Sequence, residues 1–383
     1  MKTKHIIAMM TLCTVAAGCG PKAVEAPKPE KVVVPAIELS NMDTTINPAD
    51  DFFRYANNNW LKNNPIPEEF SSYGAFTEID LNNDNLIKEI IDEVSKDSTA
   101  AKGSIAQKIR DFYNAGMDSV AIDARGYSEL TPYFEQIEAL DDKAQLASLL
   151  GDLHKNGFGG FFYAGPSLDP KDAEHYIMHL YQGGLSLTDR DDYLVPETQE
   201  MRDKYVEHVA KMFQLTGTDS IEAAKKAQGI LKLETQLAKN SMSRVERRDP
   251  DKTYNMRSVE ELQKSTPNFQ WNDYFTKAGC PAFENLNVGM PAFVAALDKV
   301  ILNTDLSTIK DYLRWKVIHG SASLLSSELD AENFSFYGNY LYGQEVQQPR
   351  WRRILGATSD CLGEAVGQLY VENTSPPKPK SAC

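Results

Sequence analysis

The sequence predicts a mainly α-helical protein with a small β element. From about Asn41 onward, apolar residues recur at helical spacing, as in the stretch 86–94, where both Ile90 and Ile91 belong to the apolar face. Only two stretches, 158–165 and 175–184, are rich in β-forming residues, and each ends in glycine. We therefore expect a multi-helical body that contains one hairpin or a small sheet.

Further helices are expected along the same body. A helical face recurs at Ile105, Ile109 and Phe112, and amphipathic runs are found at residues 143–156, 198–215, 220–239 and 305–318. Asp219 and Ser220 precede the third of these runs, where a short polar side chain can cap the first turn. The expected order along the chain is helices, then the β element, then helices again.

The first residues resemble a bacterial lipoprotein signal. Residues 1–18 begin with two lysines, continue with an apolar stretch at 6–15 and end in small residues before Cys19. The apolar stretch is too short to remain as a membrane-spanning helix, so it predicts a secretory signal. We expect cleavage after residue 18 and lipidation of Cys19; a plain signal peptide cut near Ala17 is the alternative.

This start predicts both the compartment and the layout of the chain. We expect a lipid-anchored protein of the bacterial cell envelope, with a Pro-rich tether at 19–40 and a folded body at 41–372. Loss of residues 1–18 moves the formal charge of the 383-residue chain from −14 to −16, because two lysines leave with the signal. Such an acidic balance argues against nucleic acid as a partner, since phosphate binding needs a basic face.

The cysteines do not form a disulfide framework. After removal of Cys13 and lipidation of Cys19, three cysteines remain at 280, 361 and 383. An odd number leaves at least one cysteine without a partner inside the chain, although one disulfide stays possible.

No common catalytic or metal-binding motif is present. The sequence contains no HExxH, no CxxC, no G-x-S-x-G and no phosphate-binding loop. His175 and His179 have the i, i+4 spacing that brings two metal ligands together on a helix. Their surroundings predict a strand instead, on which the two side chains lie too far apart to chelate one metal. We therefore expect no metal site at this pair.

Two charged segments allow a functional and a structural interpretation. The acidic run 189–192 could bind calcium, but Arg190 lies inside it and the spacing of an EF-hand is absent. A capped turn is the preferred interpretation. The run 243–255 mixes three arginines with Glu246 and Asp249, so an anion site is conceivable there, while a local ion-pair network at a helix end is the preferred interpretation.

The start of the expected body carries an ordered set of acidic, aromatic and apolar residues: Asp50, Asp51, Phe52, Phe53, Tyr55, Trp60, Leu61, Ile66, Pro67, Tyr73, Gly74 and Phe76. This set resembles the opening pattern of the neprilysin and endothelin-converting-enzyme family of zinc metallopeptidases, which includes the bacterial PepO oligopeptidases. Further matches follow in the family's order at 181–194, 233–255, 269–275, 334–353 and 362–372. The resemblance covers roughly residues 43–372.

The resemblance implies the N-terminal cap lobe of a bilobal enzyme. In that family a multi-helical lobe covers a thermolysin-like lobe, and short oligopeptides enter the cavity between them. Two histidines of HExxH and a downstream Glu hold the zinc, whose open position activates water, with the motif Glu as general base. This machinery lies beyond the last matching residue. We therefore expect no catalytic residue, no metal ligand and no cofactor in this chain, and a C-terminal zinc lobe as its partner.

Two positions can be compared with the family's substrate cavity. Phe76 matches the Phe that lines the family's specificity pocket, so it is our candidate cavity residue. Ser72 occupies the place of an Arg that contacts the substrate's C-terminal carboxylate in some members, which weakens any expectation of that preference.

The last eleven residues, 373–383, depart from the family pattern. A one-base frameshift at Asn373 would convert the usual continuation into the observed tail, so we interpret the tail as aberrant and the C-terminal zinc catalytic domain as absent. The expected function is that of a truncated peptidase, inactive alone. The alternatives are a non-catalytic peptide-binding or interaction lipoprotein, and an enzyme completed by a separate chain.

Overall fold

A computed structural model describes residues 37–374 of the chain. The expected signal, the lipidation site Cys19, most of the Pro-rich tether and the tail after residue 374 lie outside the described residues. The chain divides into two compact units, one ending at Pro65 and the other beginning at Ile66.

The first unit is a short helical element organised by a buried carboxylate. It contains a 3-10 turn at Leu39–Asn41 and helix α1 at Phe52–Asn63. Asp43 accepts hydrogen bonds from Thr45, from the Asn58 amide at 2.7 Å and from the Lys62 ammonium at 2.9 Å. The Thr45 hydroxyl and these two partners hold the pKa of Asp43 well below its usual range.

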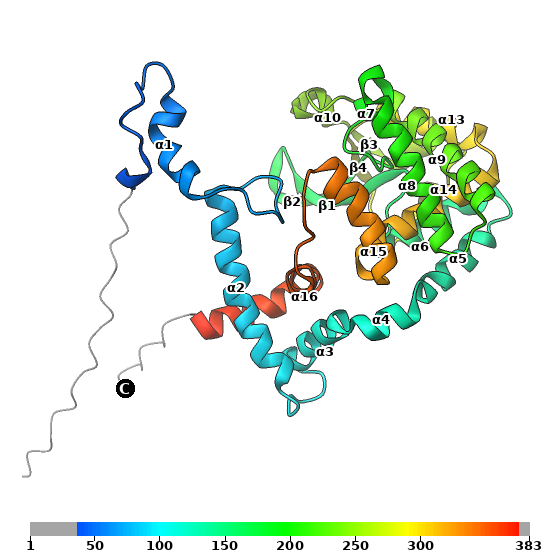
Figure 1. Cartoon of the computed structure of the whole chain (residues 1–383). Helices are drawn as coiled ribbons and strands as arrows, with labels where there is room; N and C mark the ends of the chain where they lie inside the picture. Colours follow the sequence, from blue (N-terminus) through cyan, green and yellow to red (C-terminus); the bar gives the residue numbers. More distant parts are fainter. Residues whose placement is uncertain (1–36, 375–383) are drawn as a thin grey trace, which may run out of the picture. The chain divides into compact units, whose positions relative to one another are not determined.

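The second unit is mainly helical, as the sequence predicts (Figure 1). Its helices are α2 (Ala75–Lys96), α3 (Ile105–Met117), α4 (Ser119–Arg125), α5 (Thr131–Glu138), α6 (Leu146–Lys155), α7 (Asp191–Leu194), α8 (Gln199–Leu215), α9 (Ser220–Asn240), α10 (Pro250–Thr253), α11 (Val259–Ser265), α12 (Trp271–Lys277), α13 (Pro291–Asn303), α14 (Leu306–Ser321), α15 (Ser327–Asn333) and α16 (Arg350–Thr374). A π-helix at Phe334–Leu341 continues α15. Asp219 caps α9 as expected, by accepting a hydrogen bond from the Ile221 amide at 3.0 Å.

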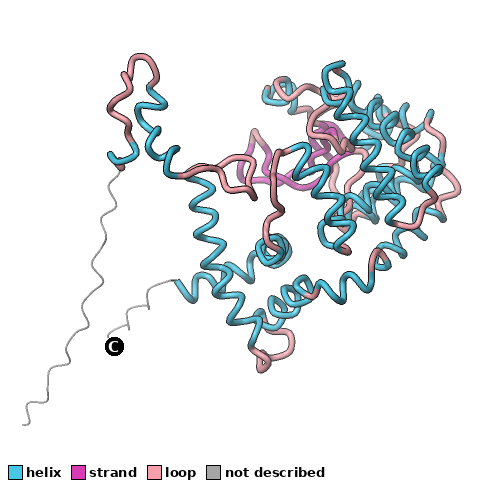
Figure 2. Tube along the Cα trace, in the orientation of Figure 1, coloured by secondary structure: helices cyan, strands magenta, loops and turns pink. Residues whose placement is uncertain are grey.

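The β element is a four-stranded sheet within this helical body (Figure 2). Strands β1 (Phe162–Asp169) and β2 (Asp172–Gln182) form the expected antiparallel hairpin. Strand β4 (Asn285–Val288) pairs parallel with β2, and β3 (Met256–Ser258) pairs antiparallel with β4. Strands β3 and β4 were not expected, because segments of three and four residues are too short to show an alternating pattern.

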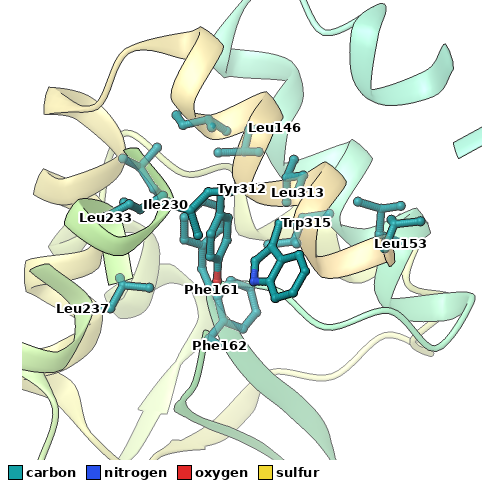
Figure 3. Packing of buried hydrophobic residues seen from close by; sticks show 14 of the residues in the cluster. Leu146, Leu153, Phe161, Phe162, Ile230, Leu233, Leu237, Tyr312, Leu313 and Trp315 are labelled. Carbon is teal, nitrogen blue, oxygen red and sulfur yellow. The ribbon is translucent and has the colours of Figure 1, made fainter. Parts of the chain in front are cut away.

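The main core lies where α6, α9 and α14 meet the start of the hairpin (Figure 3). Phe161 and Phe162 occupy its centre, and Tyr312 and Trp315 from α14 are likewise fully buried. The aliphatic side chains around them that Figure 3 labels are Leu146, Leu153, Ile230, Leu233, Leu237 and Leu313. Burial of such large side chains contributes about 1.5–3 kcal/mol each.

A smaller core joins α2, α3 and α16. Its fully buried members are Ile91, Ile109, Tyr113, Ile354, Leu355 and Val366. Helices α3 and α16 approach closely at Gly116, where an added Cβ would meet the Ile354 side chain at 2.6 Å. Helix α16 bends at Leu362, whose φ and ψ of −129° and 28° are not helical. Within residues 37–374, no helix has the length and apolar character needed to cross a membrane.

Candidate functional site

A fully buried carboxylate, Glu234, is the centre of the largest polar network in the core. Helix α9 places it on the same face as Ile230, Leu233 and Leu237, which are also buried. A charged residue on the apolar face of a helix needs partners, because an isolated buried charge is strongly destabilising. The sequence carries one signal for this site, an acidic residue at an apolar position of a helical run, which a match to known motifs does not detect.

Four side chains satisfy the two oxygens of Glu234. Oε1 accepts hydrogen bonds from the Ser186 hydroxyl at 2.6 Å and from the Lys316 ammonium at 3.1 Å. Oε2 accepts hydrogen bonds from the Tyr193 and Tyr205 hydroxyls, both at 2.8 Å. These partners come from the segment after β2 and from α7, α8 and α14, so one carboxylate joins elements far apart in the sequence.

Burial shifts the proton equilibria of this network. It lowers the pKa of Lys316, and the nearby Glu234 carboxylate opposes the shift. Burial also raises the pKa of Tyr193 and Tyr205 well above the ordinary value of tyrosine, and the negative charge of Glu234 raises it further. Both tyrosines therefore remain hydroxyl donors to Glu234 throughout the physiological range.

The network connects three of the patterns that carry the family resemblance. Ser186 lies in the 181–194 pattern and Glu234 in the 233–255 pattern, while Tyr337 of the 334–353 pattern donates a hydrogen bond to the Ser186 carbonyl at 3.2 Å. The Trp315 indole donates to both Ser186 and Tyr205. Because the Glu234 carboxylate is inaccessible to solvent, it fixes tertiary structure and cannot meet a substrate.

The histidines that the structure describes do not form a metal centre. His175 and His179 lie on strand β2, as expected. His175 is exposed and bonded to Asp172 at 2.7 Å, whereas His179 is buried and contacts the Tyr181 hydroxyl at 3.0 Å. Within the part of the chain that the structure describes, no three His, Cys, Asp or Glu side chains are grouped to hold a metal ion.

The other described histidines, His154, His208 and His319, are partly or fully buried among aromatic rings. His154 contacts the Tyr274 hydroxyl at 2.7 Å, and His208 contacts Glu332 at 2.8 Å. Burial lowers the pKa of His154 to about 4 and of His319 to about 3, and it also lowers the pKa of His208, against the influence of Glu332. Because no three potential metal ligands are grouped among them, the described residues do not fit the zinc site of an HExxH peptidase.

The two charged segments form one cluster. The Asp189 amide donates a hydrogen bond to Asp192 at 2.8 Å, which confirms a capped turn at 189–192. Arg244 and Arg247 both approach Oδ2 of Asp189, at 3.4 and 3.8 Å. An ion-pair network is present, but the expectation that it is local was wrong for Arg244 and Arg247, because their carboxylate, Asp189, lies more than fifty residues earlier in the chain.

Phe76, the candidate cavity residue, lies in the first turn of α2 and its side chain is 84% exposed. Its role toward a substrate stays a prediction. Cys280 and Cys361 are both free thiols, one half-buried and one exposed, while Cys383 lies outside the described residues.

Curated relatives extend well beyond the region that matches. An endothelin-converting enzyme homolog of Locusta migratoria is 26% identical over 364 residues, covering 89% of this chain and 49% of the relative. Human endothelin-converting enzyme 1 is 27% identical, covering 88% of this chain and 45% of the relative. The chain therefore spans about half the length of the curated relatives it matches.

Solved structures agree with this similarity. The zinc metalloprotease Zmp1 of Mycobacterium tuberculosis, in complex with an inhibitor, superimposes with a TM-score of 0.84 at 32% identity, covering 88% of this chain and 52% of that one. PepO of Lactobacillus rhamnosis has the same fold at 18% identity, with a TM-score of 0.73 over 87% of this chain and 52% of that one. The family model described as peptidase family M13 matches residues 48–383, so the chain belongs to peptidase family M13, with the N-terminal helical domain of that family.

Proposed function

We propose that this chain is the substrate-enclosing helical half of a zinc endopeptidase that hydrolyses oligopeptides. The observation that carries the proposal is the match itself: nearly nine-tenths of the chain aligns with about half of each metallopeptidase relative. The described residues do not fit a zinc site, so the zinc and its general base come from a second half of the enzyme. In this proposal the described half encloses the peptide, and the other half cleaves the peptide bond.

Exposed apolar side chains support a partner for this half. In the second unit, Phe76 and Ile79, one turn apart on α2, are 84% and 53% exposed. Soluble proteins rarely leave large apolar side chains together at the surface unless another surface covers them. We propose that the zinc-bearing half covers these exposed apolar side chains.

The proposal predicts that the chain becomes a peptidase only together with a zinc-bearing half. The gene should be sequenced through codon 373, and the reading frame that encodes HExxH should be restored. The restored protein and the 383-residue chain should then both be purified. The restored protein should bind about one equivalent of zinc, as three-ligand catalytic sites do, and cleave an internally quenched oligopeptide in a chelator-sensitive reaction. The 383-residue chain alone should do neither.

The control is the restored protein with the Glu of HExxH changed to Gln, which should keep zinc but lose cleavage. Stoichiometric zinc and chelator-sensitive cleavage by the 383-residue chain alone would refute the proposal. The lack of any downstream frame that encodes HExxH would refute the frameshift and leave a separate chain as the source of the zinc-bearing half. The alternative, a non-catalytic peptide-binding lipoprotein, gains support from the complete core of the second unit; a restored protein without activity would favour it.

We further propose that Cys19 anchors the chain to a membrane of the bacterial envelope through lipid. The support is the apolar stretch followed by small residues and a cysteine. In detergent phase separation the wild-type chain should partition into the detergent phase, and Cys19→Ser should move it to the aqueous phase. Cys13→Ser is the matched control, because this cysteine leaves with the signal. Detergent partitioning of Cys19→Ser would contradict the anchor.

A further inference from the structure

A small cavity of about 160 Å³ lies beside the charged cluster of the second unit. Three segments form its walls: the end of strand β2 at Gln182, the segment 185–190 and the segment 241–247. We call this cavity the arginine pocket, because Arg190 and Arg247 line it and Arg244 adjoins it. Its volume suits one amino-acid side chain or a small anion, not a long ligand.

The guanidinium groups around this pocket have unused hydrogen-bond donors. Arg247 and Arg244 approach one oxygen of Asp189, but neither donates a hydrogen bond to any group in residues 37–374. Arg190 donates from Nη1 to the Ser241 carbonyl at 2.9 Å, while its Nε is buried and has no hydrogen-bond partner there. An arginine carries five donors in a planar fork, so this cluster offers donors that the protein does not use.

The nearby carboxylates do not consume these donors. Asp189 presents a single oxygen to two guanidinium groups. Asp191 lies 3.6 Å from the Arg190 Nε, but its side chain is 61% exposed. Glu246 accepts hydrogen bonds from the amide and the hydroxyl of Ser243, at 2.8 and 2.7 Å, and so closes its own turn. The cluster can therefore accept one more anionic group.

Part of the pocket wall is apolar, beside the polar side chains of Gln182, Thr188 and Ser241. Leu185, Leu187 and Met242 line it, and the Tyr163 ring borders it with 61% of that residue exposed. A free phosphate would use the arginines but leave this apolar lining in contact with water. A carboxylate joined to an apolar side chain would use both parts.

We propose that the arginine pocket binds the C-terminal residue of an oligopeptide, with the arginines holding its carboxylate and the apolar walls its side chain. The pocket follows from the geometry alone; the choice of a peptide as the source of the carboxylate rests on the proposed function. Bidentate pairing of arginine with carboxylate provides the selectivity for a free C-terminus.

The test is calorimetric titration of the whole 383-residue chain with N-acetyl-Ala-Ala-Leu as the free acid, with the same peptide as its amide, and with inorganic phosphate. The free acid should bind at least about tenfold tighter than the amide, as expected for loss of a charge-assisted hydrogen bond. Arg247→Gln should abolish that difference; its side chain is 41% exposed, so the fold should tolerate the change.

Asp189→Asn should shift affinity the other way and tighten acid binding several-fold, because it removes the competing charge. The Asn keeps the side-chain oxygen that accepts the Asp191 amide. Arg257→Gln, at an exposed site on β3, is the matched control and should change nothing.

Equal binding of acid and amide would overturn the proposal, as would an unchanged preference in Arg247→Gln. Binding of phosphate without binding of the acid would also overturn it, by assigning the pocket to a free oxyanion. The titration needs neither zinc nor the second half of the enzyme. Its result therefore stands even if the restored protein proves not to be a peptidase.

Discussion

Replacing Glu234 with Gln should lower the free energy of unfolding by about 3–5 kcal/mol, the usual cost of removing one partner from a buried ion pair. The change leaves the Lys316 ammonium buried without a countercharge, since Lys316 otherwise bonds only to Ser186 among the described residues. It also turns one of the two acceptor oxygens into an amide donor, which then faces either the Tyr193 and Tyr205 hydroxyls or the donors on Ser186 and Lys316. Urea denaturation followed by circular dichroism measures the loss.

A double variant separates the charge from the packing. Glu234→Leu combined with Lys316→Met removes both charges and fills the space with apolar atoms, so it should be clearly more stable than Glu234→Gln. Glu222→Gln on the exposed side of the same helix is the control and should leave the denaturation midpoint unchanged, since that side chain is 54% exposed. A Glu234→Gln variant as stable as wild type would show that the network does not hold the fold together.

Acidification from pH 7.5 to 5 should weaken the fold by about 4 kcal/mol through two buried histidines, at 1.36 kcal/mol per pKa unit. Burial lowers the pKa of His154 to about 4 and of His319 to about 3, so both stay neutral in the folded protein at pH 5. In the unfolded chain both titrate near pH 6.5 and bind protons. The unfolded state then binds more protons, and stability falls as the pH falls.

Each histidine should contribute about 2 kcal/mol at pH 5. The dependence of unfolding free energy on pH should therefore become shallower in His154→Gln and in His319→Phe, whatever their stability at neutral pH. His175→Gln is the control, because His175 is exposed on β2. Slopes that do not change in either buried variant would contradict the lowered pKa values.

Much of the architecture could be predicted because it depends on local pattern. The long helices α8 and α9 begin and end within a residue or two of the amphipathic runs at 198–215 and 220–239. The hairpin was also expected, although β1 begins at Phe162 rather than at residue 158. There the Phe158 amide still bonds to the Leu153 carbonyl at the end of α6, so the chain becomes extended only four residues later.

The polar sites were less predictable, because their partners are distant in sequence. The 243–255 segment indicated an ion-pair network, yet the carboxylate that its arginines approach is Asp189. Strand β4 joins the sheet by parallel pairing with β2, more than a hundred residues earlier, and its four residues show no alternation of their own. In both cases the pairing energy comes from residues that the local sequence does not contain.

By itself the sequence determined that this is a mainly helical chain of peptidase family M13. The lipoprotein-like signal before Cys19 stays a prediction. Periodicity and motif order are properties of short segments, so they can be read directly. Only the tertiary structure decided that Glu234 is a buried anchor and that three arginines converge beside Asp189. Burial and convergence depend on how distant helices pack, because the same side chain is an ordinary surface charge until another element covers it.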